Sequence, residues 1–319
     1  VMNNLLAQLN TWQPFRALVI GDFMLDQLIY GAAERMSPDA PVPVLHATRN
    51  EDRPGGASNV ALCLRALKAN VECFGVLGDD LEGKVLRQAL IDHECTVDGL
   101  IIDDDRPTTI KRSMVGLAQH RHPQKMFRVD LEARDPISDD VCDAILSSIE
   151  SRVHDADVVC LEDYNKGVCT PRLCKRLIAM CREAGKPVLV DPAAIESYEK
   201  YRGATAITPN RSEAELATGL DTPEESSVQH NTTLATTLRV QLDLDAVVLT
   251  LDKHGAMLER RDHDALHVPT DPREVYDVTG AGDMVIASLA GAIANGIDWP
   301  DAVRFANAAA GLEVAEFGV

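Results

Sequence analysis

The sequence predicts a three-layer α/β domain with a mostly parallel sheet, together with a small antiparallel β lid. Along most of the 319 residues, short apolar runs alternate with segments of helical periodicity, and this alternation is typical of a parallel sheet covered by helices. Two segments, 28–50 and 108–130, interrupt the alternation with prolines, β-branched residues and short hydrophobic alternations. Unstructured loops of that length are uncommon in a compact domain, so we expect β-hairpins that form the lid rather than two long surface loops.

The apolar pattern places the elements of the body in order. Residues 16–20 (RALVI) form an apolar run that ends at Gly21 and Asp22, as expected for a strand. The chain contains no internal repeat or low-complexity segment, so we expect one domain over residues 1–319. In full, we expect strands at 16–20, 71–78, 157–161, 187–190, 204–207 and 246–251, and helices at 57–68, 82–91, between the later strands and from 281 onward.

The composition excludes several classes of function. Lys and Arg number 31 against 50 Asp and Glu, which gives a net charge of −19, and such a chain repels nucleic acid and anionic membranes. No apolar run approaches the roughly 20 residues of a membrane span, and no signal peptide precedes Asn3. We therefore expect a cytoplasmic protein with no nucleic-acid or membrane partner, which binds a small anionic ligand at one focused site.

The cysteine pattern indicates a reducing compartment. None of the eight cysteines forms a CxxC pair, and several lie in apolar runs, as Cys160 does. Reduced, buried thiols are therefore expected rather than a metal site. His120 and His122 alternate as on a strand, but no third ligand lies nearby in the sequence, so we expect surface residues.

Residues 277–283 (DVTGAGD) carry the strongest signal, because they precede an apolar helical run. The turn Gly280-Ala281-Gly282 points free backbone N–H groups at one place, and the helix dipole favours an anion there. Asp283 would lie in the first helical turn beside that anion, where its expected task is to accept a proton from an attacking hydroxyl. For an isolated GxGD, a plain helix N-terminus with an acidic dipole partner is the alternative.

This motif resembles the C-terminal signature DTxGAGD of the PfkB, or ribokinase-like, carbohydrate kinases, which transfer the γ-phosphate of ATP to a sugar hydroxyl. The resemblance implies a ribokinase-like fold, with Asp283 as the base and the amides of Gly280, Ala281 and Gly282 as an anion hole. It extends over nearly the whole chain, since residues 55–61 (GGASNVA) resemble the family's N-terminal glycine signature. The sugar-binding residues that it implies are Asp22, Asp26, Gly55, Gly56 and Asn59.

Residues 210–213 (NRSE) resemble the family's NxxE motif. The resemblance implies that Asn210 and Glu213 organise Mg²⁺, largely through water. ATP and Mg²⁺ are thus the expected cofactors, and the need for a monovalent cation stays open. The nucleotide-binding residues that the resemblance implies are Asn210, Thr250, Lys253, Gly255 and Asn307.

Three places depart from the family pattern, at Met284, at Asp252-Lys253 and at Ala193. They affect the expected nucleotide contacts more than the expected chemistry.

Within the family, a second set of segments resembles the kinases of D-glycero-β-D-manno-heptose 7-phosphate. The resemblance implies phosphorylation of the anomeric hydroxyl to give heptose 1,7-bisphosphate, on the way to ADP-heptose for lipopolysaccharide. It also implies dimers paired through the lid, in keeping with the tendency of exposed sheet edges to find partners. Related bifunctional enzymes continue into an adenylyltransferase domain, and we expect none in this chain. The segments are SPDAPVPV (37–44), RPGGASNVA (53–61), DYNKG (163–167) and EVYDVTGAGD (274–283).

A 7-phosphorylated substrate requires a cationic cradle remote from Asp283. Lys166 follows a predicted strand at the edge where α/β sites form, and the DYNKG match places Asp163 at the substrate as well. Two interpretations of Arg128 and Asp130 are equally good: they contribute to binding the phosphate, or they form an ion pair at the surface. We expect Lys111, Arg128 and Lys166 to form the cradle, out of seven basic residues: Arg35, Arg53, Lys111, Arg112, Arg121, Arg128 and Lys166.

Two alternatives stay open. The glycine signatures alone also fit another sugar kinase of the family, such as a ribokinase, fructokinase or adenosine kinase. A sugar- or nucleotide-binding protein of the same fold without catalysis is the second alternative, although the joint presence of Asp283 and Glu213 with both glycines argues against it.

Overall fold

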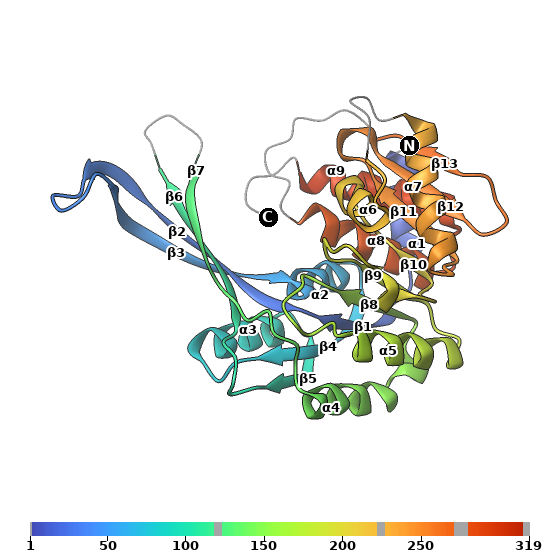
Figure 1. Cartoon of the computed structure of the whole chain (residues 1–319), viewed down its shortest axis with the longest axis horizontal. Coiled ribbons are helices and arrows are strands. Elements are labelled where there is room, and N and C mark those ends of the chain that lie inside the picture. The colour runs from blue at the N-terminus through green and yellow to red at the C-terminus, as the bar shows by residue number, and fades with distance from the viewer. Residues whose placement is uncertain (1, 118–122, 222–226, 271–279, 315–319) are drawn as a thin grey trace.

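Two sheets organise the chain (Figure 1). This computed structural model describes residues 2–117, 123–221, 227–270 and 280–314. Within them, the larger sheet has nine strands in the order β13-β12-β11-β10-β9-β8-β1-β4-β5, and the smaller has four in the order β3-β2-β6-β7. The strands are β1 (Phe15–Gly21), β2 (Phe23–Met36), β3 (Pro43–Gly56), β4 (Ala69–Leu77), β5 (Thr96–Ile102), β6 (Thr109–Gly116), β7 (Gln124–Leu131), β8 (Val158–Glu162), β9 (Val188–Asp191), β10 (Ala206–Ile207), β11 (Ala246–Thr250), β12 (Ala256–Arg260) and β13 (Leu266–Val268). The helices are α1 (Met2–Thr11), α2 (Ala57–Ala66), α3 (Leu81–Asp92), α4 (Asp139–Glu150), α5 (Pro171–Glu183), α6 (Arg211–Thr218), α7 (Val228–Gln241), α8 (Ala281–Ala294) and α9 (Trp299–Glu313).

The larger sheet is parallel from β11 to β5. Ala17 of β1, for example, pairs in parallel with Val71 of β4 and with Val158 of β8. At one edge, β12 and β13 extend the sheet in antiparallel pairing. All six predicted strands of the body are confirmed, as β1, β4, β8, β9, β10 and β11. The strands β5, β12 and β13 are additional to the prediction; β5 contains Asp98 and Gly99, residue types that are uncommon in strands.

Helices cover both faces of this sheet, which confirms the predicted three layers (Figure 1). Side chains alternate along β1: Ala17 and Val19 pack with α2, α8 and α9, whereas Leu18 and Ile20 pack with α4, α5 and α7. All four side chains are at most 1% exposed. Such apolar runs are typical of parallel strands that are buried on both faces.

Most helices begin at a side chain that accepts a hydrogen bond from a free backbone N–H, as helix N-termini require. Asp80, Ser138, Thr170 and Asp298 cap α3, α4, α5 and α9 in this way. The helices α2 and α8 are different, because their N-caps, Gly56 and Gly280, have no side chain. At α2, the Ala57 N–H donates to the Asp22 carbonyl at 3.2 Å. At α8, the described residues provide no such acceptor for the first N–H groups.

The lid consists of β2, β3, β6 and β7, which project from the α/β body (Figure 1). The pairs β2–β3 and β6–β7 are antiparallel, and β2 joins β6 in parallel. The predicted β lid is confirmed as this second sheet. Its strands overlap the predicted segments 28–50 and 108–130, and β2 and β3 reach further toward the body than those segments. This extension places the inner ends of both strands at the junction with the larger sheet. Every residue of the edge strand β7 is exposed.

Two other expectations concern the cysteines and histidines. All eight cysteines are buried and free, as predicted. Arg121, His120 and His122 lie outside the described residues. Among the helices that are described, none has the length and apolar character to cross a bilayer.

Candidate active site

Asp283 lies in the first turn of α8. The N-cap Gly280 has a φ of +85°, a conformation that glycine adopts without strain. A Cβ at Gly280 would lie 2.7 Å from Oε1 of Glu313, so the turn also requires close packing. Met284 donates the first helical hydrogen bond, to the Gly280 carbonyl at 2.9 Å. The N–H groups before it donate to no acceptor among the described residues, and their binding of an anion stays a prediction.

The carboxylate of Asp283 is held by two donors. The Tyr164 hydroxyl donates to Oδ1 at 2.5 Å, and Nδ2 of Asn59 donates to Oδ2 at 2.8 Å. Burial raises the pKa of Asp283 to about 6, although both hydrogen bonds and the charge of Lys111 act in the opposite direction. Asp283 is therefore oriented, 5% exposed and more basic than an ordinary aspartate, which are properties of a general base.

The lid contributes Asp26 and Lys111 to the same space. Oδ1 of Asp26 is buried and accepts no hydrogen bond from a described residue, and burial raises the pKa of this carboxyl. A Cβ at Gly55 would lie 2.5 Å from Oδ2 of Asp26, so a larger residue there would displace this carboxylate. Lys111 pairs with Asp26 in the lid sheet, and its Nζ lies 4.9 Å from the ring centroid of Tyr164. Asp26 thus offers an acceptor for a hydroxyl, and Lys111 offers a cation.

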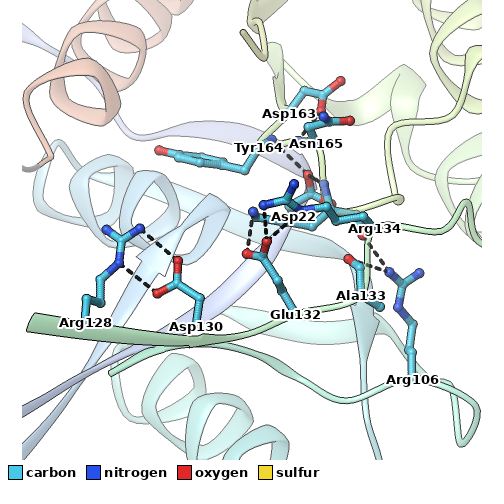
Figure 2. Close-up of polar contacts among 11 residues, drawn as sticks. Asp22, Arg106, Arg128, Asp130, Glu132, Ala133, Arg134, Asp163, Tyr164 and Asn165 are labelled. Carbon is cyan, nitrogen blue, oxygen red and sulfur yellow. Dashed lines mark hydrogen bonds and ion pairs between the residues drawn. The ribbon is translucent and has the colours of Figure 1, made fainter. Parts of the chain in front are cut away.

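Asp22 holds the loop that follows β8. Its Oδ2 accepts the N–H groups of Tyr164 (2.8 Å) and Lys166 (3.0 Å), and its Oδ1 accepts that of Val168 (3.2 Å); Figure 2 shows Asp22 below this loop. Burial raises the pKa of Asp22 to about 6, and the charge of Asp163 adds to the effect. Asp22 therefore positions Tyr164 toward Asp283, while its direct contact with sugar stays a prediction.

Asp163 is also engaged inside the protein. Its Oδ2 accepts the Tyr201 hydroxyl at 2.7 Å and forms an ion pair with Lys200, and its Oδ1 accepts the N–H of Asn165 at 2.8 Å. These contacts fix the start of the loop. The predicted contact between Asp163 and substrate stays a prediction.

Three carboxylates converge near the first turn of α8. The carboxylate oxygens of Glu162, Asp191 and Asp283 lie within 4.8 Å of one another. Glu162 and Asp191 end the neighbouring parallel strands β8 and β9. Burial raises the pKa values of Glu162 and Asp191 well above their ordinary range. The charges of Asp191 and Asp283 add to the effect at Glu162, and those of Glu213 and Asp283 add to it at Asp191. The hydroxyl of Thr208 donates to Oδ1 of Asp191 at 2.9 Å.

The predicted nucleotide-binding residues lie around the β11, β12 and β13 strands. Nδ2 of Asn307 on α9 donates to the carbonyl of Val268 at 2.9 Å, and a Cβ at Gly255 would lie 2.1 Å from the same oxygen. Lys253 is exposed on the short turn between β11 and β12. The structure thus brings Asn307 and Gly255 to one place, and their contact with a nucleotide stays a prediction.

Asn210 and Glu213, the predicted metal pair, form a capping box at α6. The Asn210 N–H donates to Oε2 of Glu213 at 2.8 Å, and the Glu213 N–H donates to Oδ1 of Asn210 at 3.0 Å. An isolated bridge joins Asn210 to Thr250 at the end of β11. Burial raises the pKa of Glu213. A carboxylate and an amide oxygen suit Mg²⁺ chemically, although each already has one hydrogen bond within the cap.

Most of the basic residues expected to bind a phosphate have protein partners. Figure 2 shows Arg128 donating to both oxygens of Asp130, at 2.7 and 2.8 Å. Nζ of Lys166 lies 2.5 Å from Oε2 of Glu132, and Nη2 of Arg134 lies 2.7 Å from Oε1 of the same carboxylate. Among the described bases of the predicted set, Lys111 forms no ion pair with a described carboxylate, and its charge lowers the pKa values of Asp26 and Asp283. The remaining described bases are Arg53, which pairs with Glu51, Arg112, which contacts Gln27 and Glu82, and Arg35, which is exposed.

Four residues of the site are additional to the prediction: Tyr164, Glu162, Asp191 and Glu313. Glu162 and Asp191 follow apolar strand residues, so the rule that α/β sites form at the carboxyl ends of parallel strands was a usable signal for them. The hydroxyl of Tyr164 meets Asp283 across 119 positions of sequence. No local pattern in the sequence indicates such a contact.

The chain matches the family model of the pfkB family carbohydrate kinases over residues 15–319. It is 43% identical over 306 residues to "Bifunctional protein HldE" of Geobacter metallireducens, and 42% identical over 303 residues to the protein of that name from Bradyrhizobium diazoefficiens. The alignments cover 96% and 94% of this chain and 61% and 60% of those proteins. The chain therefore spans about three fifths of the curated relatives that it matches.

Solved structures share the fold. A ribokinase of Arabidopsis thaliana, complexed with ribose and ATP, superposes with a TM-score of 0.73 at 22% identity, covering 96% of this chain and 95% of that one. The tetrameric inhibited form of phosphofructokinase-2 from Escherichia coli gives a TM-score of 0.74 at 16% identity, covering 94% of each chain. These similarities confirm the predicted ribokinase-like fold.

Proposed function

Because the chain belongs to the pfkB family of carbohydrate kinases, we propose that it transfers the γ-phosphoryl group of ATP to the anomeric hydroxyl of D-glycero-β-D-manno-heptose 7-phosphate. The product is then heptose 1,7-bisphosphate. The placement of Asp283 beside the open N-terminus of α8 supports the kinase chemistry, and the similarity to proteins named HldE supports the heptose substrate.

Asp283 is the proposed base. The sugar hydroxyl oxygen attacks the γ-phosphorus, its proton passes to a carboxylate oxygen of Asp283, and the bond from the γ-phosphorus to the bridging oxygen of ADP breaks. Tyr164 and Asn59 keep the carboxylate aimed at the hydroxyl. The free N–H groups at the start of α8 stabilise the charge of the transferred group, which is the larger part of catalysis in phosphoryl transfer.

The sugar is proposed to lie between α8 and the lid. Asp26, whose Oδ1 accepts no hydrogen bond from a described residue, is the proposed acceptor for a sugar hydroxyl, and Gly55 leaves room for its carboxylate. ATP is proposed to lie toward the β11–β13 edge of the sheet, at Thr250, Gly255 and Asn307. Asn210 and Glu213 are the proposed holders of Mg²⁺, which would neutralise phosphate charge when bound.

The 7-phosphate is proposed to bind at the lid side. Lys111 is available without breaking an ion pair, whereas Arg128 and Lys166 would exchange Asp130 and Glu132 for phosphate oxygens. In such an exchange each base keeps its charge-assisted hydrogen bonds, while Asp130 and Glu132 lose theirs. Lys111 is therefore the first contact to test. Dimers paired through the lid are part of the same proposal.

The deciding measurement is kcat/KM for the heptose 7-phosphate against the free heptose. One charge-assisted contact is worth about 1.5–3 kcal/mol, so the phosphorylated sugar should be preferred at least about tenfold. Lys111→Ala should reduce this preference, and Lys175→Ala on the outer face of α5 should not. Equal values for the two sugars would refute the heptose-phosphate substrate and leave a sugar kinase.

The same assay tests the two alternatives. A better substrate among ribose, fructose or adenosine would identify another activity of the family. If no sugar stimulates ATP consumption while sugar or nucleotide still binds, the chain is a binding protein of the same fold.

A further inference from the structure

We propose that Arg106, in the connection between β5 and β6, is a positioning residue for the catalytic base. It ties the lid to the loop after β8 (residues 163–168), and this loop holds Tyr164 where its hydroxyl orients Asp283. The inference deepens the proposed function, because it rests on Asp283 as the base, but it requires no particular sugar.

The guanidinium of Arg106 is directed at backbone carbonyl groups. Its Nη2 donates to the carbonyl of Lys166 at 2.6 Å and to the carbonyl of Ala133 at 3.5 Å (Figure 2). Gly167 packs against the same group, since a Cβ there would lie 3.1 Å from Nη2 of Arg106 and 2.1 Å from the carbonyl oxygen of Asp135. Hydrogen bonds from a charged donor are stronger than those between neutral groups. One side chain therefore joins the loop after β8 firmly to the segment that follows β7.

The loop after β8 has a backbone conformation that needs such support. Asn165 has a φ of +56° and Gly167 a φ of +91°, and conformations of this kind persist where surrounding contacts hold them. Asp22 accepts hydrogen bonds from N–H groups of the loop, but an ionised carboxylate cannot donate to the carbonyl groups. Arg106 supplies a hold on the carbonyl side, at Lys166.

The lid is joined to this loop at two places. Glu132 directly follows β7, and its Oε2 lies 2.5 Å from Nζ of Lys166. The next residue, Ala133, is linked to the carbonyl of the same lysine through Arg106. Tyr164 lies two positions before Lys166, and its hydroxyl donates to the proposed base at 2.5 Å. Loss of the Arg106 contacts should therefore loosen the loop and turn this hydroxyl away from the base.

Steady-state kinetics of Arg106→Met test this role, because Met is a long side chain that donates no hydrogen bond. We expect kcat to fall by about tenfold to a hundredfold, as for other small misplacements of catalytic groups, and KM for ATP to stay within about twofold of wild type. Arg106→Lys restores a charged donor and should recover most of the lost kcat.

Arg87→Met is the matched control. Nη1 of Arg87, on α3, donates to the carbonyl of Leu100 on β5 at 3.3 Å, so this variant also removes a bond from an arginine to the backbone, but outside the loop after β8. Its kcat should stay within about twofold of wild type.

A double-mutant cycle with Tyr164→Phe shows whether Arg106 acts through the tyrosine. Tyr164→Phe should itself lower kcat, and adding Arg106→Met should lower it by no more than about twofold further, because residues that act through one contact are not additive. Hydrogen exchange of the chain without substrate gives a second measurement. The N–H groups of residues 163–168 should exchange about tenfold faster in Arg106→Met than in wild type or Arg87→Met.

The positioning role requires both results. Losses that multiply in the double variant, an Arg106→Met variant with the kcat of wild type, or unchanged exchange in the loop would each overturn it. Circular dichroism checks that the variants fold. If Arg106→Met does not fold, Arg106→Lys takes its place in the cycle, and its smaller loss must disappear when Tyr164 is Phe.

The kinetics use the sugar that proves to be the substrate when heptose 7-phosphate is compared with other sugars. A wrong assignment of the base would appear as turnover retained in Asp283→Asn. A wrong assignment of Arg106 would appear while Asp283 is still essential, so the two failures are distinguishable.

Discussion

Asp283 combines burial with two orienting donors, Tyr164 and Asn59. Asp283→Asn keeps the size of the side chain and removes the proton acceptor. We expect kcat to fall by about 10²–10⁴-fold, which is the usual contribution of a general base. Steady-state ATP consumption with the pure variant checks this. Asp98→Asn, at an exposed acid of β5, is the matched control, and near-wild-type turnover in Asp283→Asn would remove the role of Asp283 as base.

Glu313 makes stability depend on pH. It is 6% exposed and accepts no hydrogen bond from a described residue; burial raises its pKa to about 7, and the charge of Asp283 contributes. Because the pKa is higher in the folded than in the unfolded state, the stabilising contribution is complete below about pH 4.5 and is lost as pH rises through about 7. Glu313→Gln should therefore unfold at a higher temperature than wild type at pH 8, by roughly 2–4 °C for each kcal/mol recovered.

Thermal unfolding of both proteins between pH 5 and pH 8 checks this expectation. The difference in unfolding temperature between the Glu313→Gln variant and wild type should increase as pH increases. A difference in unfolding temperature that is the same at every pH would show that Glu313 has the same pKa in the folded and the unfolded chain.

At the scale of the element, α6 separates two roles of Glu213. Its side chain completes the capping box with Asn210, and Gln serves equally well at that position of a capping box. Glu213→Gln should therefore keep the unfolding temperature and shift the Mg²⁺ dependence of activity to higher concentration, because a neutral oxygen binds a hard cation less well. Glu215→Gln, on the same helix, is the control.

A Mg²⁺ titration of activity and an unfolding curve are both needed. An unchanged Mg²⁺ dependence with lowered stability would make Glu213 a purely structural cap.

The helices and strands of the body could be predicted from the sequence, whereas contacts between distant segments could not. Apolar runs and helical periods indicate the body strands and helices, because burial on two faces leaves a strong local pattern. The glycine turn before α8 and Asp283 could also be predicted, since the N–H groups of a helix start are a local property. The role of Asp22 could not, because its three bonds reach residues more than 140 positions away. The partners of Lys166 and Arg128 likewise depend on how the lid and the loop after β8 meet.

At the scale of the whole molecule, the lid presents an open edge and an apolar face. Phe127 and Val129, two positions apart on β7, are 57% and 39% exposed, so they point to the same side. Paired lids would cover them, because open edges and apolar strands find partners. We expect a dimer mass by light scattering at micromolar concentration, and a shift toward monomer in Phe127→Lys. Val240→Lys, at an exposed apolar residue of α7, should leave the mass unchanged, and a monomeric wild-type protein would contradict the lid dimer.

The strands β2 and β3 reach from the outer end of the lid to the side of the site where the sugar is proposed to lie, at Phe23 and Gly56, and their pairing is irregular at Tyr30–Gly31 and Ala32–Arg35. Each has 14 residues, and a strand rises about 3.3 Å per residue, so the hairpin is a stiff arm of roughly 45 Å. Asp26 and Gly55 lie at the inner end of this arm. A contact at the outer end of the lid is therefore joined by two continuous strands to the groups proposed to hold the sugar.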